Sequence, residues 1–209
     1  MRRSAAEVPP RAVRVAGVVP CAGASQRMGM EKALLDAGGA TFVERVVEAL
    51  RIGGCAPVFV VVTDAGGRTA EMAKRAGAQV LVNLDPGDGP ITSLRIALLT
   101  LGDGVEGVAF CPVDHPLIRP RTVRTLLAAF ARTNPPLVIP VHAGHRGHPT
   151  LFHRGLFPEL ADLKLDGGAR TVVHRHVEEA ALVPVDDEGT ITDIDTPEEY
   201  LKAMGRGPA

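Results

Sequence analysis

A short stretch rich in glycine and other small residues, 20–32, holds the strongest candidates for chemistry in this chain. It follows an apolar run that ends at Val19, and it contains two cations, Arg27 and Lys32. Because glycine and alanine carry little or no side chain, the backbone N–H groups of such a loop can approach an anion closely. A forked guanidinium and a compact ammonium could each neutralise part of a polyphosphate. The stretch therefore predicts a binding loop for a nucleoside triphosphate.

This loop differs from the two commonest phosphate-binding motifs. It lacks the Gly-Lys-Ser/Thr ending of a P-loop and the three-glycine spacing of a dinucleotide fingerprint. Read as x-x-Ala-Gly-x-Ser-x-Arg-Met-Gly-x-x-Lys, it resembles the signature of the nucleotidyltransferases with a MobA-like fold, in particular the molybdenum cofactor cytidylyltransferases. Pro20 and Cys21 replace the usual Leu-Ala pair at the entry to the loop. The alternative interpretation is an ordinary strand-to-loop turn that carries surface cations.

The resemblance implies roles for individual residues of the loop. Arg27 and Lys32 would be catalytic, because they would stabilise the reacting phosphorus and the departing pyrophosphate. The loop residues that would bind the nucleotide are Ala22, Gly23, Ala24, Ser25 and Gly29. Relatives that transfer GMP carry glycine where Ala22 stands, and the added methyl group should narrow the slot for the base. We therefore expect CTP to be preferred over GTP.

Two further segments resemble the nucleotide-binding and metal-binding regions of the family. Gly89 and Ser93 lie near a predicted helix start, where the family serine sits beside the base and ribose, although Ser93 alone would be interpreted as a helix cap. Asp114 follows an apolar run, and a carboxylate at such a strand end is well placed to hold a cation on phosphate oxygens. The alternative for Asp114 is a turn aspartate before a proline-led loop. We expect the neighbouring His115 to be a solvated loop histidine.

The second metal ligand is expected in the segment 193–198, which closely matches the family. If residues 191–195 form a strand, Asp193 and Asp195 lie on the same side of it. The resemblance selects Asp195, which would meet Asp114 across neighbouring strand ends, and implies that the two carboxylates hold Mg²⁺. A helix-capping aspartate is the competing interpretation of Asp195.

The acceptor side is expected in two segments of the second half of the chain. Three histidines within 142–148 could suggest a transition-metal site, but no carboxylate or cysteine is interleaved with them. Gly-His-Pro at 147–149, followed by Leu-Phe, resembles the family's acceptor segment, so we expect His148 to face the acceptor. Segment 166–170 resembles another, in which Arg170 would hold an anionic group of the acceptor. An arginine on an exposed helix face is the alternative.

Apolar periodicity indicates the elements that must position these residues. The predicted strands cover 13–19, 57–63, 79–83, 105–111 and 137–141, with a further apolar run at 182–185. Helical spacing follows most of them, and capping boxes predict helix starts at Thr41 and Thr196. Strands that alternate with helices indicate a three-layer α/β/α, Rossmann-like fold with a mainly parallel sheet. The resemblance, which extends from Val15 to Leu201, implies the same nucleotidyltransferase fold.

Composition fits one globular domain. The chain has 209 residues, 45% of them hydrophobic, and a net charge of −1, so nothing favours a nucleic-acid or membrane partner. We expect a domain at 13–204 between a disordered tail at 1–12 and a frayed one at 205–209. Three cysteines without a close pair suggest neither a disulfide framework nor a zinc ribbon, and a reducing cytoplasm fits best. No segment has the length of a signal peptide or a membrane span.

The resemblance implies a magnesium-dependent enzyme of molybdenum cofactor biosynthesis. It would transfer CMP from CTP to a phosphorylated acceptor, the terminal phosphate of molybdopterin, and release pyrophosphate. A molybdoenzyme or a cofactor-insertion protein would be a further partner. The alternatives are transfer to a sugar phosphate or another small phosphorylated alcohol, and a non-catalytic chaperone that binds a nucleotide or cofactor. The presence of Arg27, Lys32 and Asp114 argues against loss of catalysis.

Overall fold

The computed structural model describes residues 12–23 and 31–205, in which eight strands form one mixed, mostly parallel sheet. The strands are β1 (Val15–Pro20), β2 (Val58–Val62), β3 (Gln79–Val82), β4 (Gly107–Phe110), β5 (Leu137–His142), β6 (His145–Arg146), β7 (Thr150–His153) and β8 (Ala181–Pro184). The α-helices are α1 (Phe42–Gly53), α2 (Arg68–Arg75), α3 (Pro90–Thr100), α4 (Pro120–Thr133), α5 (Phe157–Ala161), α6 (Ala169–His176) and α7 (Pro197–Ala203). The order across the sheet is β3-β2-β1-β4-β7-β5-β6, and β8 pairs with β5.

The strand order reverses direction beside β1. The chain runs outward from β1 through β2 to β3 and then crosses back to β4, which lies on the other side of β1 and parallel to it. The carboxyl ends of β1 and β4 therefore meet at a topological switch point, where open α/β sheets bind ligands. β7 is antiparallel to β4, with Thr150 opposite Phe110, so the start of β7 lies at the same edge.

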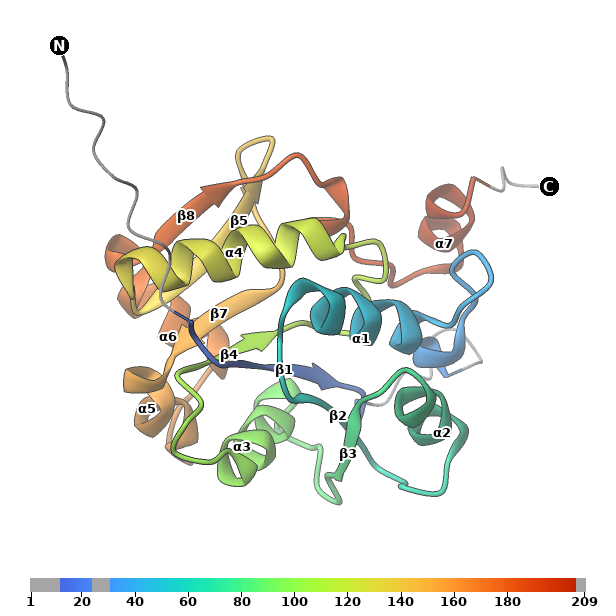
Figure 1. Ribbon diagram of the computed structural model, residues 1–209. Coiled ribbons are helices and arrows are strands. Elements are labelled where there is room, and N and C mark those ends of the chain that lie inside the picture. Colours follow the sequence, from blue (N-terminus) through green and yellow to red (C-terminus); the bar gives the residue numbers. More distant parts are fainter. Residues whose placement is uncertain (1–11, 24–30, 206–209) are drawn as a thin grey trace, which may run out of the picture.

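Helices cover both faces of the sheet (Figure 1). On one face α1, α2 and α4 pack in one apolar cluster, which includes Phe42, Leu50 and Phe130. On the other face α3, α5 and α6 form a second cluster around Leu94 and Leu160. Every residue of β1 is buried, as expected for a parallel strand covered from both sides. The predicted three-layer α/β/α architecture is confirmed.

Both predicted capping boxes are present. Thr41 accepts a hydrogen bond from the Glu44 backbone, and the Glu44 carboxylate accepts one in return from the Thr41 N–H, so α1 begins where expected. Thr196 and Glu199 make the same reciprocal pair at the start of α7.

Several boundaries differ from the prediction. Residues 191–195 do not form a strand but a loop between β8 and α7, so alternation along a strand cannot place Asp193 and Asp195. The antiparallel strands β6 and β7 were not predicted, because β6 has only two residues, both polar, and β7 has only four, so neither shows a long apolar or alternating run. α6 begins at Ala169 and ends at His176, where a 3-10 turn follows, and not near 178.

The structure also bears on the predicted tails, the cysteines and the search for membrane spans. The tails predicted at 1–12 and 205–209 lie almost entirely outside the described residues. Cys21, Cys55 and Cys111 are free thiols. Across 12–23 and 31–205, no helix is both long enough and apolar enough to cross a membrane.

Candidate active site

Two carboxylates and one ammonium meet at the switch point of the sheet. Asp114 lies in the loop that follows β4, and Lys32 opens a short 3-10 helix (Lys32–Leu34) after the small-residue loop. Asp195 lies directly before Thr196, the N-cap of α7. The Lys32 ammonium contacts a carboxylate oxygen of Asp195 and lies 4.0 Å from Oδ2 of Asp114. Residues widely separated in the sequence thus form one charged cluster.

Hydrogen bonds on both sides hold Asp195 in this cluster. The Glu199 carboxylate accepts hydrogen bonds from the backbone N–H of Asp195 (2.8 Å) and of Thr196 (2.9 Å), and these bonds lower the pKa of Glu199. On the other side, the N–H of the buried Ile194 donates to the backbone carbonyl of Asp114 at 3.0 Å. Asp195 therefore meets Asp114 from a loop. The predicted position at a neighbouring strand end is wrong. The capping interpretation of Asp195 is also wrong, because Thr196 is the N-cap.

The carboxylate of Asp114 is largely buried, in surroundings where a nearby cation would stabilise its charge. Burial raises the pKa of Asp114 above its ordinary value, and the charge of Lys32 opposes that rise. Its Oδ1 is buried without a hydrogen-bond partner among the described residues, and His115 Nε2 lies 3.7 Å away. An unsatisfied buried oxygen of this kind costs folding free energy unless something binds it.

The two carboxylates fit the way in which proteins hold Mg²⁺. That ion is usually bound by one or two carboxylates together with phosphate oxygens of the substrate and water, and not by a cage of protein ligands. The described parts of the chain contain no group of three or more His, Cys, Asp or Glu side chains placed to hold a metal ion. Asp114 and Asp195 are the two carboxylates of the cluster that could hold a phosphate-bridged ion.

Two histidines lie beside Asp114. The rings of His115 and His148 are 4.8 Å apart between centroids, at an interplanar angle of 52°. His115 is buried, so the expectation of a solvated loop histidine is wrong. Burial lowers the pKa of His115, and burial together with the proximity of His115 lowers the pKa of His148 to about 4. Both rings are therefore neutral at neutral pH.

A cavity of about 980 Å³ opens next to this cluster, a volume that suits a small-molecule ligand. His148 and Arg170, the two residues expected to face the acceptor, both line it. Phe110, Ile139 and Phe152 contribute apolar wall, as in most small-molecule sites. The structure therefore places the two expected acceptor residues in the wall of one cavity, and His148 is the lining residue that also interacts with Asp114.

The predicted nucleotide-binding residues are only partly within the described chain. Ala24, Ser25, Arg27 and Gly29 lie outside it. Ala22 is buried, whereas Gly23 is exposed, and a Cβ built at Gly23 would have no heavy atom of residues 12–23 or 31–205 within 4 Å.

The second predicted nucleotide segment opens α3. Gly89 is the N-cap of this helix, with a positive φ of 81° that favours glycine. Ser93 lies inside the helix, so its interpretation as the cap is wrong. Its side chain is buried and accepts a hydrogen bond from the Asn83 side-chain amide at 3.3 Å.

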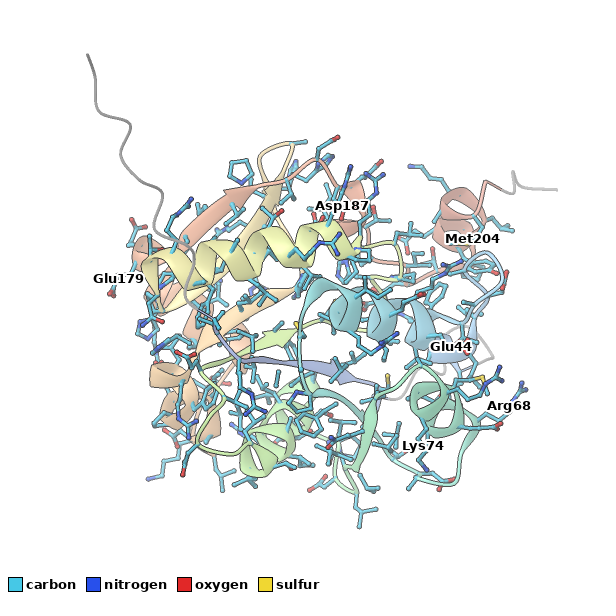
Figure 2. The ribbon with its side chains drawn as sticks, viewed as in Figure 1. Glu44, Arg68, Lys74, Glu179, Asp187 and Met204 are labelled. Carbon is cyan, nitrogen blue, oxygen red and sulfur yellow. The ribbon has the colours of Figure 1, made fainter. Side chains whose placement is uncertain are left out.

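Sequence reasoning missed three residues of this region. Arg146 and Lys164 add two cations to the cavity, and only the fold brings their segments together. The buried Asp187 accepts hydrogen bonds from the Arg119 N–H (2.9 Å) and the Thr122 hydroxyl (2.5 Å) at the start of α4 (Figure 2). It thereby anchors the segment that leads to Asp195. In the sequence Asp187 resembles any other turn aspartate.

The chain is similar to known proteins over most of its length. Residues 17–180 match the family described as "MobA-like NTP transferase domain". Nicotine blue oxidoreductase of Paenarthrobacter nicotinovorans is 30% identical over 202 residues, which cover 91% of this chain and 96% of that protein. A probable molybdenum cofactor guanylyltransferase of Mycolicibacterium paratuberculosis is 30% identical over 163 residues, covering 77% and 79% of the two chains.

Among solved structures, the fold is similar to that of the Rv0371c protein of Mycobacterium tuberculosis. The TM-score is 0.76 at 27% identity, and the match covers 93% of this chain and 100% of that one. The same protein in complex with manganese gives a TM-score of 0.72 at 26% identity, covering 92% and 99%.

Proposed function

Because the chain belongs to the MobA-like NTP transferase family, we propose that it transfers a nucleoside monophosphate from a nucleoside triphosphate to a phosphorylated acceptor. The observation that carries this proposal is the cluster of Asp114, Lys32 and Asp195 at the sheet's switch point. His148, which interacts with Asp114, connects this cluster to the cavity that His148 and Arg170 line. One relative is named as an oxidoreductase, so family membership alone does not set the reaction. Paired carboxylates with a cation suit phosphate chemistry.

In the proposed reaction, a phosphate oxygen of the acceptor attacks the α-phosphorus of the nucleotide. A new P–O bond forms at the α-phosphorus. The bond between the α-phosphorus and the oxygen that bridges to the β-phosphate breaks, and pyrophosphate leaves with the electron pair of that bond. An ionised phosphate is already a nucleophile, so the protein needs to supply positioning and charge neutralisation rather than a general base. Lys32 and Arg27 would stabilise the charge that grows on the pyrophosphate. The neutral His148 and the cationic Arg170 would orient the acceptor.

Asp114 and Asp195 would hold the divalent ion, which we propose to be Mg²⁺. A bound ion of this kind supplies Lewis-acid stabilisation of phosphate oxygens. Support comes from the buried, unpartnered Oδ1 of Asp114 and from the manganese complex of the similar Mycobacterium tuberculosis protein.

For the nucleotide, we propose CTP as the preferred donor. The support is Ala22, because glycine is expected at this position in relatives that transfer GMP. The methyl group of Ala22 should narrow the slot for the base and favour cytosine, which is smaller than guanine. One methyl group in a fitted pocket changes specificity by about ten- to a few hundredfold. GTP is the second candidate, because a relative of 30% identity is named as a guanylyltransferase.

For the acceptor, we propose molybdopterin, as the same relative's name suggests. The wide cavity and its cations are compatible with a large organic phosphate. A molybdoenzyme or a cofactor-insertion protein would then receive the product.

Pyrophosphate release tests this function. Purified protein would be incubated with Mg²⁺, with CTP or GTP, and with molybdopterin or a sugar phosphate as the acceptor. We expect release that requires nucleotide, acceptor and metal together, and that is fastest with CTP and molybdopterin. Faster release with GTP would reject the cytidylyl assignment alone. Nucleotide and acceptor binding without release under any combination would favour a non-catalytic binding protein.

A further inference from the structure

Lys32 differs from the other lysines of the chain in its burial. The four lysines are Lys32, Lys74, Lys164 and Lys202. Lys32 is 9% exposed, whereas the other three are exposed. A buried ammonium is unfavourable unless opposite charge compensates it. Here the compensation comes from the carboxylates of Asp195 and Asp114.

The same two carboxylates are the residues that would hold the divalent ion. Lys32 contacts Asp195 and lies 4.0 Å from Asp114, so its single positive charge already serves both groups. A second cation on these oxygens would be repelled by the ammonium, because two like charges a few ångströms apart near a protein surface repel each other. Lys32 therefore cannot stay in this place without weakening the binding of a metal ion.

We propose that Lys32 is an internal counter-ion that occupies the cation position between Asp114 and Asp195 until a nucleotide binds. The phosphates of the nucleotide then take over the ammonium and free the two carboxylates, so metal and nucleotide bind cooperatively. This inference rests on the proposed nucleotidyl transfer and adds a binding order to it. In the absence of nucleotide, the protein should bind free divalent metal weakly.

The geometry supports a movable ammonium more than a fixed structural one. Lys32 lies at the first position of its 3-10 helix, directly after the loop expected to bind phosphates. The Asp195 side chain that it contacts is 52% exposed, so this pair is not sealed in the core. A lysine side chain is long and flexible, and its compact ammonium can exchange one anionic partner for another.

Binding of Mn²⁺ tests the proposal without relying on turnover. Free Mn²⁺ would be measured by electron paramagnetic resonance in titrations of the parent, Lys32→Gln, Lys32→Arg and Lys202→Gln. Without nucleotide, we expect Lys32→Gln to bind Mn²⁺ about tenfold or more tightly than the parent, because a repelling charge is gone. Lys32→Arg, which keeps the charge, and Lys202→Gln, which removes an exposed charge from α7, should stay close to the parent.

When nucleotide is present, the order of the Mn²⁺ affinities of the parent and Lys32→Gln should reverse. With saturating CTP or GTP and no acceptor, Lys32→Gln should bind Mn²⁺ more weakly than the parent, because the phosphates have lost their ammonium partner. Thermal melting would check that each variant is folded, and Lys32→Met would replace Lys32→Gln if the latter is not. Unchanged or weaker Mn²⁺ binding by the folded, uncharged variant without nucleotide would overturn the counter-ion proposal.

A further variant separates this proposal from the proposed function. Asp114→Asn should lose the Mn²⁺ affinity seen with nucleotide, and in the Lys32→Gln background it should abolish the gain. Mn²⁺ binding that is insensitive to Asp114→Asn would mean that the metal site itself is misplaced, whatever Lys32 does. Loss of binding in Asp114→Asn without any gain in Lys32→Gln would leave the metal site intact and reject only the counter-ion.

Discussion

α1 and α7 both begin with a capping box, but the two boxes have different roles. Each has a threonine N-cap and a glutamate that form a reciprocal capping box. Beyond the cap, α1 buries a broad apolar face, whereas α7 has no buried residue. Glu44 lies at the start of α1 (Figure 2), and among the described residues its carboxylate accepts from Thr41 alone, while Glu199 also accepts from the N–H of Asp195. One box starts a core helix, and the other holds a loop of the candidate active site.

The comparison shows that capping chemistry does not reveal what a helix is for. At α1, burial works to raise the pKa of Glu44, but the hydrogen bonds from Thr41 outweigh it and lower the pKa. At α7, the hydrogen bond from Asp195 is the largest cause of the lowered pKa of Glu199. The two boxes thus have similar electrostatics. What differs is the neighbour, which is a hydrophobic core for α1 and a charged cluster for α7.

The largest expected effect is on stability, at α1. Phe42→Ala should lower the free energy of unfolding by about 3–5 kcal/mol, because Phe42 is fully buried and its removal leaves a cavity. Tyr200→Ala on α7, whose ring packs 6.1 Å from that of Phe42, should cost clearly less. Urea unfolding of both variants measures the difference. Equal losses would mean that α7 belongs to the core as much as α1 does.

The next effect is on turnover, at α7. Asp195→Asn should reduce pyrophosphate release on the order of a hundredfold, because a charged group at the reacting phosphates is lost. The loss in urea unfolding should be smaller than that of Phe42→Ala, since the Asp195 side chain is half exposed and Asp114 still lies 4.0 Å from the buried Lys32 ammonium. Glu198→Gln, an exposed acidic residue in the first turn of the same helix, is the matched control and should keep the parent's activity. A similar loss in both variants would point to a general charge effect.

The capping glutamates themselves provide the sharpest contrast. Glu44→Gln should lower the free energy of unfolding by about 0.5–1 kcal/mol with turnover unchanged, in the range of lost caps. Glu199→Gln should lower turnover by up to about tenfold, because a small displacement of Asp195 weakens its alignment. Denaturation and initial-rate measurements on the pair check both expectations. Loss of activity in Glu44→Gln without loss of stability would contradict the division of roles.

The last expected effect is on the pH dependence of stability. Below about pH 6.5 the unfolded chain binds a proton at His148, whereas the folded chain binds it only below about pH 4. Stability should therefore fall as the pH is lowered through that window, and His148→Gln should make the fall shallower. His145→Gln, at an exposed position in β6, is the control. Parallel stability curves for the parent and His148→Gln would show that His148 is not held neutral.

Local sequence patterns predicted the fold well where one element decides its own structure. The apolar run of β1, the capping boxes of α1 and α7 and the proline that opens α4 need only their neighbours in the sequence. The predictions failed where contacts with segments distant in the sequence determine the local structure. Residues 191–195 look like a strand, but the N–H groups of Ile194 and Asp195 instead donate to Asp114 and Glu199. The buried His115 packs against the ring of His148, which the sequence alone does not show.

The candidate site shows the same limit. Asp114, Lys32 and Asp195 could each be selected from the family signature, yet no spacing in the sequence shows that one ammonium contacts both carboxylates. The cavity cations Arg146 and Lys164 were missed because β6 and the segment before α6 meet only in the folded chain. Which of Asp193 and Asp195 faces Lys32 was likewise a question of loop geometry.

We propose that Asp114, Lys32 and Asp195 form the catalytic cluster of a metal-dependent nucleotidyltransferase. The most direct test compares Asp114→Ala with the parent for Mg²⁺-dependent pyrophosphate release, with thermal melting measured on the same samples. We expect a loss of turnover on the order of a hundredfold or more, while the melting temperature stays within about 4 °C. Near-normal turnover of the folded variant would remove Asp114 from the site and reject this proposal.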